Sequence, residues 1–181
     1  MEWADTGDSG ESRSSRGFHS ISRPNARVLV LGTLPGERSL VCGEYYAHPQ
    51  NRFWTIMGSI LGFDPLGPYK DRVQPLLDHR IALWDVCATA ERPGSLDASI
   101  RTATVVPNDF PGFFAEHPDI DRVCFNGQHA AKLFVRLVHG SLPTHLRCEW
   151  VTLPSTSPAN AAVPFQEKRR LWAQALLNTS A

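Results

Sequence analysis

Four short apolar runs, alternating with segments of helical periodicity, constrain the fold of this chain more than any other feature. The apolar runs cover residues 28–31, 81–86, 122–125 and 149–153. Such continuous runs are typical of strands covered on both faces, as in a parallel sheet. Helical patterns occupy residues 51–61, 71–78, 107–114, 128–138 and 165–177. This alternation predicts an α/β protein, a three-layer α/β/α sandwich with a central, mainly parallel four-stranded sheet.

The length of 181 residues suits one domain with one core. Residues 1–25 are rich in Ser, Gly, Arg and Asp and have few apolar positions, so we expect a flexible N-terminal tail there. Residues 26–181 are then the folded domain. The 18 basic residues equal the 18 acidic ones, so a contact with nucleic acid would need a local basic patch.

Cysteine usage and hydropathy point to an intracellular protein. The four cysteines are far apart and form no Cys-x-x-Cys pair, and Cys87 and Cys124 lie in or beside apolar runs. We expect reduced, mostly buried thiols and no metal site or other cofactor. No apolar run approaches the roughly 20 residues that span a bilayer, and the N-terminus lacks a signal-peptide core. The prediction is a cytoplasmic protein without membrane contact.

Polar loops follow each predicted strand, at residues 32–51, 85–95, 126–128 and 154–160. Ligands of open parallel sheets bind beyond the carboxyl ends of the strands. We therefore expect the four loops to form one site.

The loop after the first strand begins with Gly32-Thr33-Leu34-Pro35-Gly36 and matches no dinucleotide or P-loop fingerprint. Gly32 would let backbone approach a ligand closely, or the segment is only a sharp turn. Tyr46 offers a flat face for stacking on a nucleobase, or it packs in the core. His48 is an ordinary loop histidine, a phosphate contact or a proton carrier. Asn51 caps the following helix, holds a water or base edge, or does both.

The other loops add a carboxyl group, an amide and hydroxyl groups. Asp85 ends an apolar strand, where partial desolvation would raise its pKa and mark a functional group, unless it only bonds a nearby loop. Asn126 is a base contact or a turn residue. Ser155, Ser157 and Asn160 suit phosphate binding, or reflect common loop composition. The basic cluster at residues 168–170 is interpreted as a solvated helix face.

In combination, these residues resemble the uracil-DNA glycosylase superfamily over residues 27–177. Its mismatch-specific uracil and thymine branches carry Gly-x-Asn-Pro-Gly followed by an aromatic residue and Pro-x-Asn-x-Phe-Trp. The chain has Gly-Thr-Leu-Pro-Gly at residues 32–36 and Tyr-Ala-His-Pro-Gln-Asn-Arg-Phe-Trp at residues 46–54. Phe-Asn-Gly at 125–127 and Leu-Pro-Ser-Thr-Ser at 153–157 resemble further motifs of the superfamily.

One departure is informative, because Leu34 replaces the Asn that orients the attacking water in the mismatch branches. The hypoxanthine (deoxyinosine) DNA glycosylases also lack that Asn, and their pattern resembles Leu-Trp-Asp-Val at 83–86 and Arg-Pro-Gly-Ser-Leu-Asp at 92–97. In that branch the Asn that matches Asn51 is implicated in catalysis.

The resemblance implies a monofunctional DNA glycosylase of base excision repair, monomeric and acting on DNA that contains deaminated bases. Hypoxanthine is the expected base, with a uracil-preferring mismatch enzyme or an inactive nucleic-acid-binding module as alternatives. We expect Asn51 to be catalytic and Gly32, Tyr46, Asp85 and Asn126 to bind the base. The expected DNA contacts are His48, Ser155, Ser157 and Asn160.

Overall fold

A computed structural model describes residues 14–144 and 146–177. Its central sheet has the order β3-β2-β6-β7, and all three strand pairs are parallel. The strands are β2 (Val28–Gly32), β3 (Ile81–Asp85), β6 (Arg122–Asn126) and β7 (Glu149–Leu153). All four strands predicted from the sequence are confirmed to within one residue.

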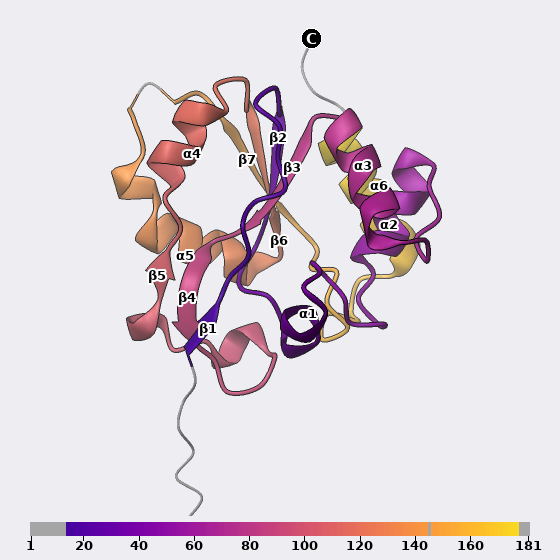
Figure 1. Ribbon diagram of the computed structural model, residues 1–181, viewed down its shortest axis with the longest axis horizontal. Helices are drawn as coiled ribbons and strands as arrows, with labels where there is room; N and C mark the ends of the chain where they lie inside the picture. Colours follow the sequence, from indigo (N-terminus) through magenta and orange to yellow (C-terminus); the bar gives the residue numbers. More distant parts are fainter. Residues whose placement is uncertain (1–13, 145, 178–181) are drawn as a thin grey trace, which may run out of the picture.

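Helices cover both faces of this sheet, as Figure 1 shows. One face packs against α2 (Phe53–Leu61), α3 (Tyr69–Asp78) and α6 (Phe165–Leu177). The other face packs against α4 (Phe110–Glu116) and α5 (Gln128–Leu137). Alternate residues of β2 enter opposite cores, Val28 and Val30 on the α2 side and Leu29 and Leu31 on the α4 side. The predicted three-layer sandwich is therefore confirmed.

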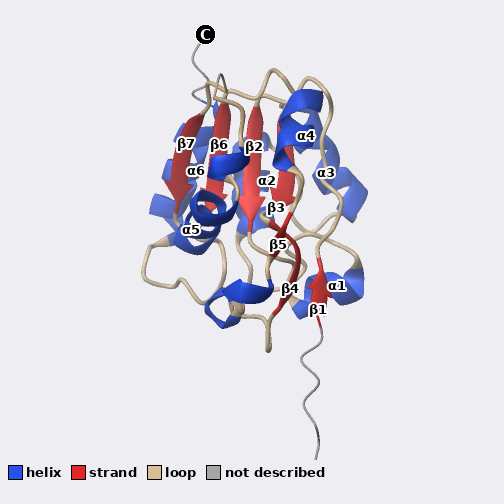
Figure 2. Ribbon diagram, turned by 90° about the vertical axis from the view of Figure 1, so that its left-hand side faces the viewer, coloured by secondary structure: helices blue, strands red, loops and turns tan. Residues whose placement is uncertain are grey.

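Smaller elements gather at the carboxyl ends of the parallel strands, toward which all four arrowheads of Figure 2 point. They include α1 (Glu37–Cys42) and an antiparallel sheet of β1 (Ser14–Arg16), β4 (Cys87–Glu91) and β5 (Val106–Pro107). Three 3-10 turns complete the described elements: η1 (Asp97–Ser99), η2 (Thr102–Thr104) and η3 (His139–Ser141).

One of these elements, β4, corrects a loop expected from the sequence. Residues 85–95 were expected to be a loop, yet residues 87–91 pair with β1 and β5 as strand β4. Its Cys-Ala-Thr-Ala-Glu composition carries a weak strand signal, and its partners lie far away in sequence. In the loop that follows β4, Ser95 Oγ accepts a hydrogen bond from the backbone N–H of Glu37 at 3.2 Å.

The predicted tail is wrong from residue 14 onward. Ser14–Arg16 forms β1, and the backbone of Ile21 bridges that of Leu83. Consecutive carbonyl groups of this segment accept side-chain hydrogen bonds, Phe18 from Trp84 Nε1 and His19 from Tyr45 Oη, both at 3.1 Å. Backbone pairing holds the segment although its composition is polar. Residues 1–13 lie outside the described part of the chain.

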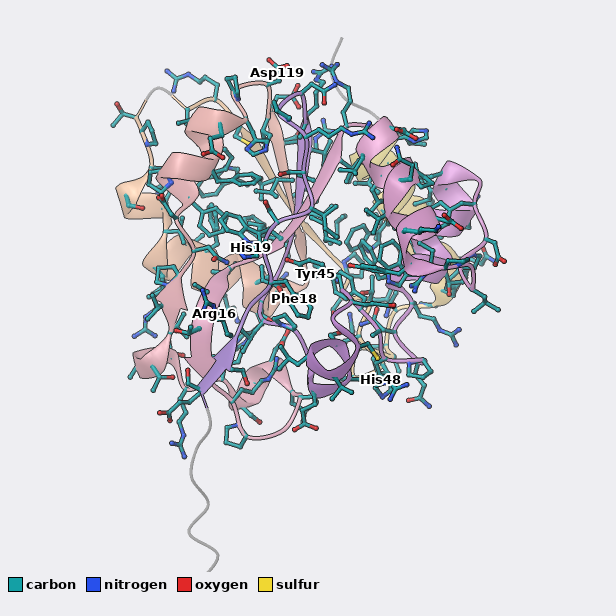
Figure 3. The ribbon with its side chains drawn as sticks, viewed as in Figure 1. Arg16, Phe18, His19, Tyr45, His48 and Asp119 are labelled. Atoms are coloured by element: carbon teal, nitrogen blue, oxygen red, sulfur yellow. The ribbon has the colours of Figure 1, made fainter. Side chains whose placement is uncertain are left out.

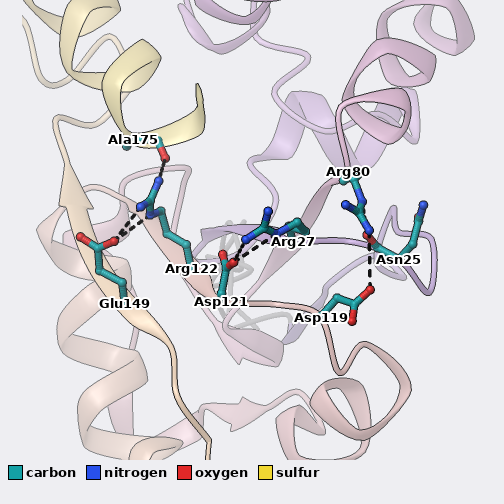
Figure 4. Close-up of polar contacts among 8 residues, drawn as sticks. All are labelled: Asn25, Arg27, Arg80, Asp119, Asp121, Arg122, Glu149 and Ala175. Atoms are coloured by element: carbon teal, nitrogen blue, oxygen red, sulfur yellow. Dashed lines mark hydrogen bonds and ion pairs between the residues drawn. The ribbon is translucent and has the colours of Figure 1, made fainter. Parts of the chain in front are cut away.

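Ion pairs line the opposite, amino edge of the sheet (Figure 4). Arg27 pairs with Asp121, and Arg80 with Asp119 at 3.6 Å. Arg122 pairs with Glu149 at 2.8 Å and also donates to the carbonyl oxygen of Ala175. Because each of these guanidinium groups faces a carboxylate, this edge serves the fold rather than an anionic ligand.

Candidate active site at the carboxyl edge of the sheet

A cavity of about 780 Å³ lies at the carboxyl edge, between the loops that follow the four parallel strands. The structure brings together in its lining all nine site residues predicted from the sequence. They are Gly32, Tyr46, His48, Asn51, Asp85, Asn126, Ser155, Ser157 and Asn160. The expectation of one site built from four loops is therefore correct in its geometry.

The innermost part of the cavity is a close contact between Gly32, Asp85 and Tyr46. Gly32 and Asp85 are register partners at the ends of β2 and β3. A Cβ on residue 32 would lie 2.4 Å from Asp85 Oδ1 and 2.9 Å from Tyr46 Oη. Only glycine therefore lets the carboxyl and phenol groups approach the strand end this closely.

Asp85 is a buried carboxyl group, only 3% exposed, and its Oδ2 has no hydrogen-bond partner among the described residues. Burial, and then the negative charge of Asp97, raise the pKa of Asp85 to about 8 against the opposing effect of Arg92. A buried carboxyl group without a donor is costly unless it is neutral or meets a ligand. Its position in a cavity makes it a candidate for ligand recognition.

Tyr46 lies beside this carboxyl group with a left-handed backbone, φ 55°. Its ring stacks on Phe53 at a centroid distance of 4.2 Å. Its buried hydroxyl group has no partner at full hydrogen-bond geometry in the described part of the chain, but the side chain of Asn126 lies near enough to lower its pKa by hydrogen bonding. Burial, and then the nearby Asp85, raise the pKa of the Tyr46 phenol, which therefore stays protonated.

Tyr45 is a core residue rather than a second stacking surface. It is 3% exposed, and its ring meets that of Phe18 edge-on at 5.2 Å. Its hydroxyl group bonds the carbonyl oxygen of His19, and Figure 3 shows it beside both residues. Through its backbone carbonyl it also accepts a bond from Trp54 Nε1 at 2.8 Å. Tyr45 thereby supports the adjacent Tyr46.

Asn51 lies where the first loop enters α2. Its Oδ1 accepts the N–H of Phe53, the first residue of α2, at 3.0 Å. Asn51 thus gives this N–H a hydrogen-bond partner although Arg52, not Asn51, is the N-cap residue. The Nδ2 group has no hydrogen-bond partner within the described residues. One end of this amide therefore serves the helix, and the other is available to a ligand or water.

His48 is an exposed residue in the same loop as Asn51, before α2 (Figure 3). Its Nδ1 accepts the backbone N–H of Gln50 at 3.2 Å. This hydrogen bond assigns the proton of a neutral imidazole to Nε2, so the ring can act as a donor.

Asn126 holds two strand-end loops together. Its Oδ1 accepts the N–H of Thr156 at 2.8 Å, and its Nδ2 donates to Thr156 Oγ1 at 2.9 Å. The Asn126 side chain also acts on the Tyr46 hydroxyl group, whose pKa it lowers. Gly127, with φ 101°, leaves room for Ser155, since a Cβ there would lie 2.9 Å from Ser155 Cβ.

The loop of residues 155–160 rests on Lys168, which sequence reasoning placed on a solvated face. Lys168 is 4% exposed, and its Nζ donates to the carbonyl oxygens of Ser155 and Asn160. Burial, together with Arg52, lowers the pKa of this ammonium group. The sequence pattern placed Lys168 wrongly because it does not show that the loop of residues 155–160 packs over this side of α6. Arg170, in the same basic cluster, does face solvent and pairs with Glu167.

Sequence reasoning missed a buried arginine behind the Gly32–Gly36 turn. Arg92 Nη1 donates to the carbonyl oxygen of Leu34 at 3.1 Å, and Nη2 donates to that of Pro35. Arg92 also faces Asp97 at 3.6 Å, and Asp97 accepts from Thr33 Oγ1 at 2.6 Å. The sequence did carry a signal for Arg92, because this arginine stands before Pro-Gly in one of the loops expected to line the site.

Leu34 is buried in the core with 5% exposure, so its side chain offers the cavity no polar group.

Cys87 and Cys124 are buried as expected, whereas Cys42 is exposed. Within the described residues, no group of three metal-ligating side chains and no helix long and apolar enough to cross a membrane is found.

Comparisons with known proteins agree with this geometry. The family model of the uracil DNA glycosylase superfamily matches residues 19–178. A hypoxanthine DNA glycosylase of Methanosarcina acetivorans is 34% identical over 146 residues, which cover 80% of this chain and 87% of the relative. Its counterpart in Methanosarcina barkeri is 35% identical over 118 residues, 65% of this chain and 73% of the relative.

A solved structure gives the same result. The solution NMR structure of a Methanosarcina acetivorans protein, provisionally described as a uracil DNA glycosylase, has a TM-score of 0.75 and 31% identity. The match covers 91% of this chain and 97% of that one. With a family model spanning nearly all described residues and relatives that share a third of the sequence, the chain belongs to the uracil DNA glycosylase superfamily.

Proposed function

We propose that this protein is a monofunctional DNA glycosylase that extrudes a deaminated purine, hypoxanthine, from DNA and hydrolyses its N-glycosidic bond. The two relatives named hypoxanthine DNA glycosylase support the substrate. The observation that carries the proposal is the buried, unpartnered carboxyl group of Asp85 in a cavity of about 780 Å³. Such a pocket has room for one extruded base.

In this proposal, ionised Asp85 accepts the N1–H of hypoxanthine. Adenine carries an acceptor at N1 and would leave the carboxylate unpaired, so normal adenine is rejected. The amide of Asn126 and the hydroxyl group of Tyr46 supply donors at the same end of the cavity. The Tyr46 ring face opposite Phe53 stacks on the base.

Hydrolysis places water on C1′ while the electron pair of the C1′–N9 bond passes to the departing base. The sugar becomes oxocarbenium-like, so the protein has to stabilise the leaving base and position the water. Leu34 provides no side-chain group for the water, whereas Asn51 has an unpartnered Nδ2. Asn51 is therefore the proposed catalytic residue, which positions water or polarises the base.

DNA would be held by the rim of the cavity. Ser155 Oγ and Ser157 Oγ each accept a backbone N–H, which leaves both O–H groups to donate to phosphate. His48 and Asn160 line the same cavity and would add donors. No lysine lines the cavity in the described part of the chain, so we expect no Schiff-base lyase step. We further propose that the enzyme acts as a monomer in the cytoplasm, beside the nucleoid.

The test is an excision assay with end-labelled duplexes that contain inosine, uracil, xanthine or a G·T mismatch. After alkali, the inosine duplex should yield the most cleaved strand; without alkali, none should be cleaved. Preference for uracil would instead indicate the mismatch-type enzyme. Binding without product from any duplex would indicate the inactive module.

Asp85→Ala separates recognition from structure. We expect it to reduce hypoxanthine excision more than uracil excision, because a lost N1–H contact is specific to the purine. Equal losses on both substrates would assign Asp85 a structural role.

A further inference from the structure

Tyr46 has a backbone conformation that aromatic residues rarely adopt. Its φ of 55° lies in the left-handed region, and within the described residues Arg80 is the only other non-glycine residue with a positive φ. Such a conformation persists only where surrounding groups fix it, and it concentrates at functional sites. Because Tyr46 lines the cavity, the groups that fix its backbone also fix part of the site.

Two side chains from neighbouring helices hold the main chain just before Tyr46. The N–H group of Tyr45 donates to Tyr69 Oη, in α3, at 3.0 Å. The carbonyl oxygen of Tyr45 accepts from Trp54 Nε1, in α2, at 2.8 Å. These two groups belong to the two successive peptide planes that precede Tyr46. The φ angle of Tyr46 is measured from the second of these planes, so both hydrogen bonds help to set it.

Arg72 joins the two side chains that hold this segment. Its guanidinium carbon lies 4.9 Å from the ring centroid of Trp54 and 5.3 Å from that of Tyr69, within the range of a cation–π contact. The two rings meet edge-on at a centroid distance of 5.7 Å. Arg72 Nη2 also pairs at 2.9 Å with Glu44, the residue before Tyr45. We call Trp54, Tyr69 and Arg72 the Tyr45 clamp.

No member of the Tyr45 clamp is among the described residues that line the cavity. The clamp can therefore act on a bound base only through the segment that it holds. We propose that Tyr69 is a positioning residue for base recognition. Its hydroxyl group, together with Trp54, keeps Tyr46 in the left-handed conformation that stacks the ring on Phe53 and presents its other face to the extruded base. This inference rests on the proposed function.

Tyr69→Phe tests the clamp, because it removes one hydroxyl group and keeps the ring beside Trp54 and Arg72. Ser141→Ala is the matched control. Ser141 Oγ donates to the carbonyl oxygen of Val138 at 2.7 Å, and Ser141 does not line the cavity. Each variant thus loses one hydrogen bond between a hydroxyl group and the main chain. Urea unfolding sets a temperature at which both variants are folded in the assays.

The first readout is the position of the Tyr46 ring in the protein without DNA. The chain has three tyrosines, so isotope-labelled tyrosine rings give three sets of NMR signals, which Tyr→Phe variants assign. The signals of Tyr46 carry a ring-current shift from Phe53, on which its ring stacks at 4.2 Å. Tyr69→Phe should move them, and Ser141→Ala should leave them in place. Unchanged Tyr46 signals in Tyr69→Phe would overturn the clamp.

The second readout is a double-mutant cycle with Tyr46→Ala, measured as single-turnover excision of hypoxanthine from duplex DNA. Tyr69→Phe alone should lose about tenfold in rate, because a small misplacement of a group that holds the substrate is costly. In the Tyr46→Ala background, Tyr69→Phe should cost less than about twofold, since no ring remains to be positioned. Ser141→Ala should match the wild type. Equal losses from Tyr69→Phe in both backgrounds would show general damage to the fold and would overturn the proposal.

The two readouts separate this inference from the proposed function. If the Tyr46 signals move in Tyr69→Phe but the wild type excises no base from any duplex, the proposed function alone is refuted. If the wild type excises hypoxanthine and Tyr69→Phe does so at the same rate, the positioning role of Tyr69 alone is refuted.

Discussion

The α-carbon of Gly32 lies directly against the carboxyl group of Asp85, at the paired ends of β2 and β3. The parallel register puts the two residues opposite each other, and the missing side chain of Gly32 gives the carboxyl group its place. The phenol oxygen of Tyr46 also reaches this space, 2.9 Å from the place that a Cβ on residue 32 would take. The absence of a Cβ at Gly32 therefore makes the space in which Asp85 and Tyr46 line the proposed base pocket.

Gly32→Ala should displace both Asp85 and Tyr46, because the added methyl group would lie 2.4 Å from Asp85 Oδ1. A misplacement of this size costs on the order of 100-fold in the rate of hypoxanthine excision. Single-turnover assays would measure the loss. Gly140→Ala is the matched control, since its Cβ would meet nothing within 4 Å. Equal activity of the two variants would contradict the proposed pocket.

The raised pKa of Asp85 predicts how activity depends on pH. With a pKa of about 8 in the empty protein, the carboxylate that would accept N1–H is the minor form at pH 7. The ratio kcat/KM for hypoxanthine should therefore rise with pH and level off above about 8, because kcat/KM reports the free enzyme. The inflection in kcat should lie lower, since the bound N1–H stabilises the ionised form. A fall of kcat/KM through pH 8 would mean that the neutral acid is used.

The same pKa predicts a pH dependence of stability. Between the ordinary Asp pKa near 4 and about 8, the unfolded chain loses a proton that the folded protein keeps. Fewer protons bound in the unfolded state mean that the free energy of unfolding falls as pH rises through this window. Urea unfolding at pH 5, 7 and 9 would measure the decline. Asp85→Asn should flatten it, and an unchanged slope in that variant would assign the decline to other groups.

The sequence predicted the parallel sheet and the residues of the cavity because both depend on local patterns. An apolar run marks each buried strand, and the polar residues after it must lie at the carboxyl edge whatever the detailed packing. Arg92 and Lys168 could not be placed in this way, since each is buried by hydrogen bonds to loop carbonyl groups that no local pattern assigns to it. For Arg92 the acceptor, Leu34, lies 58 residues away in the sequence. Strand β1 was missed for a similar reason, because its partner β4 lies more than 70 residues away.

Asn51→Asp should separate the two roles of this amide. The aspartate keeps an oxygen that accepts the N–H of Phe53, so the free energy of unfolding should change by less than about 0.5 kcal/mol. It loses the Nδ2 donor, and excision should fall about 100-fold or more, as when one positioned donor is removed from other active sites. Asn51→Ala should lose both, with an added destabilisation of about 1 kcal/mol. Full activity of Asn51→Asp would remove Asn51 from the chemistry.

Lys168→Met should loosen the loop that carries Ser155, Ser157 and Asn160. Two carbonyl oxygens of this loop would lose their charged donor, at a cost of about 1–3 kcal/mol in the free energy of unfolding. Because the serine hydroxyl groups are proposed to hold phosphate, the dissociation constant for inosine-containing duplex should rise about tenfold, equivalent to about 1.4 kcal/mol. Fluorescence anisotropy at a temperature where the variant is folded would measure it. Arg170→Met removes a cation from the same helix, where its partners are the helix residues Glu167 and Gln174, and this variant should bind DNA like the wild type. If both variants weakened binding equally, general charge rather than the held loop would explain the loss.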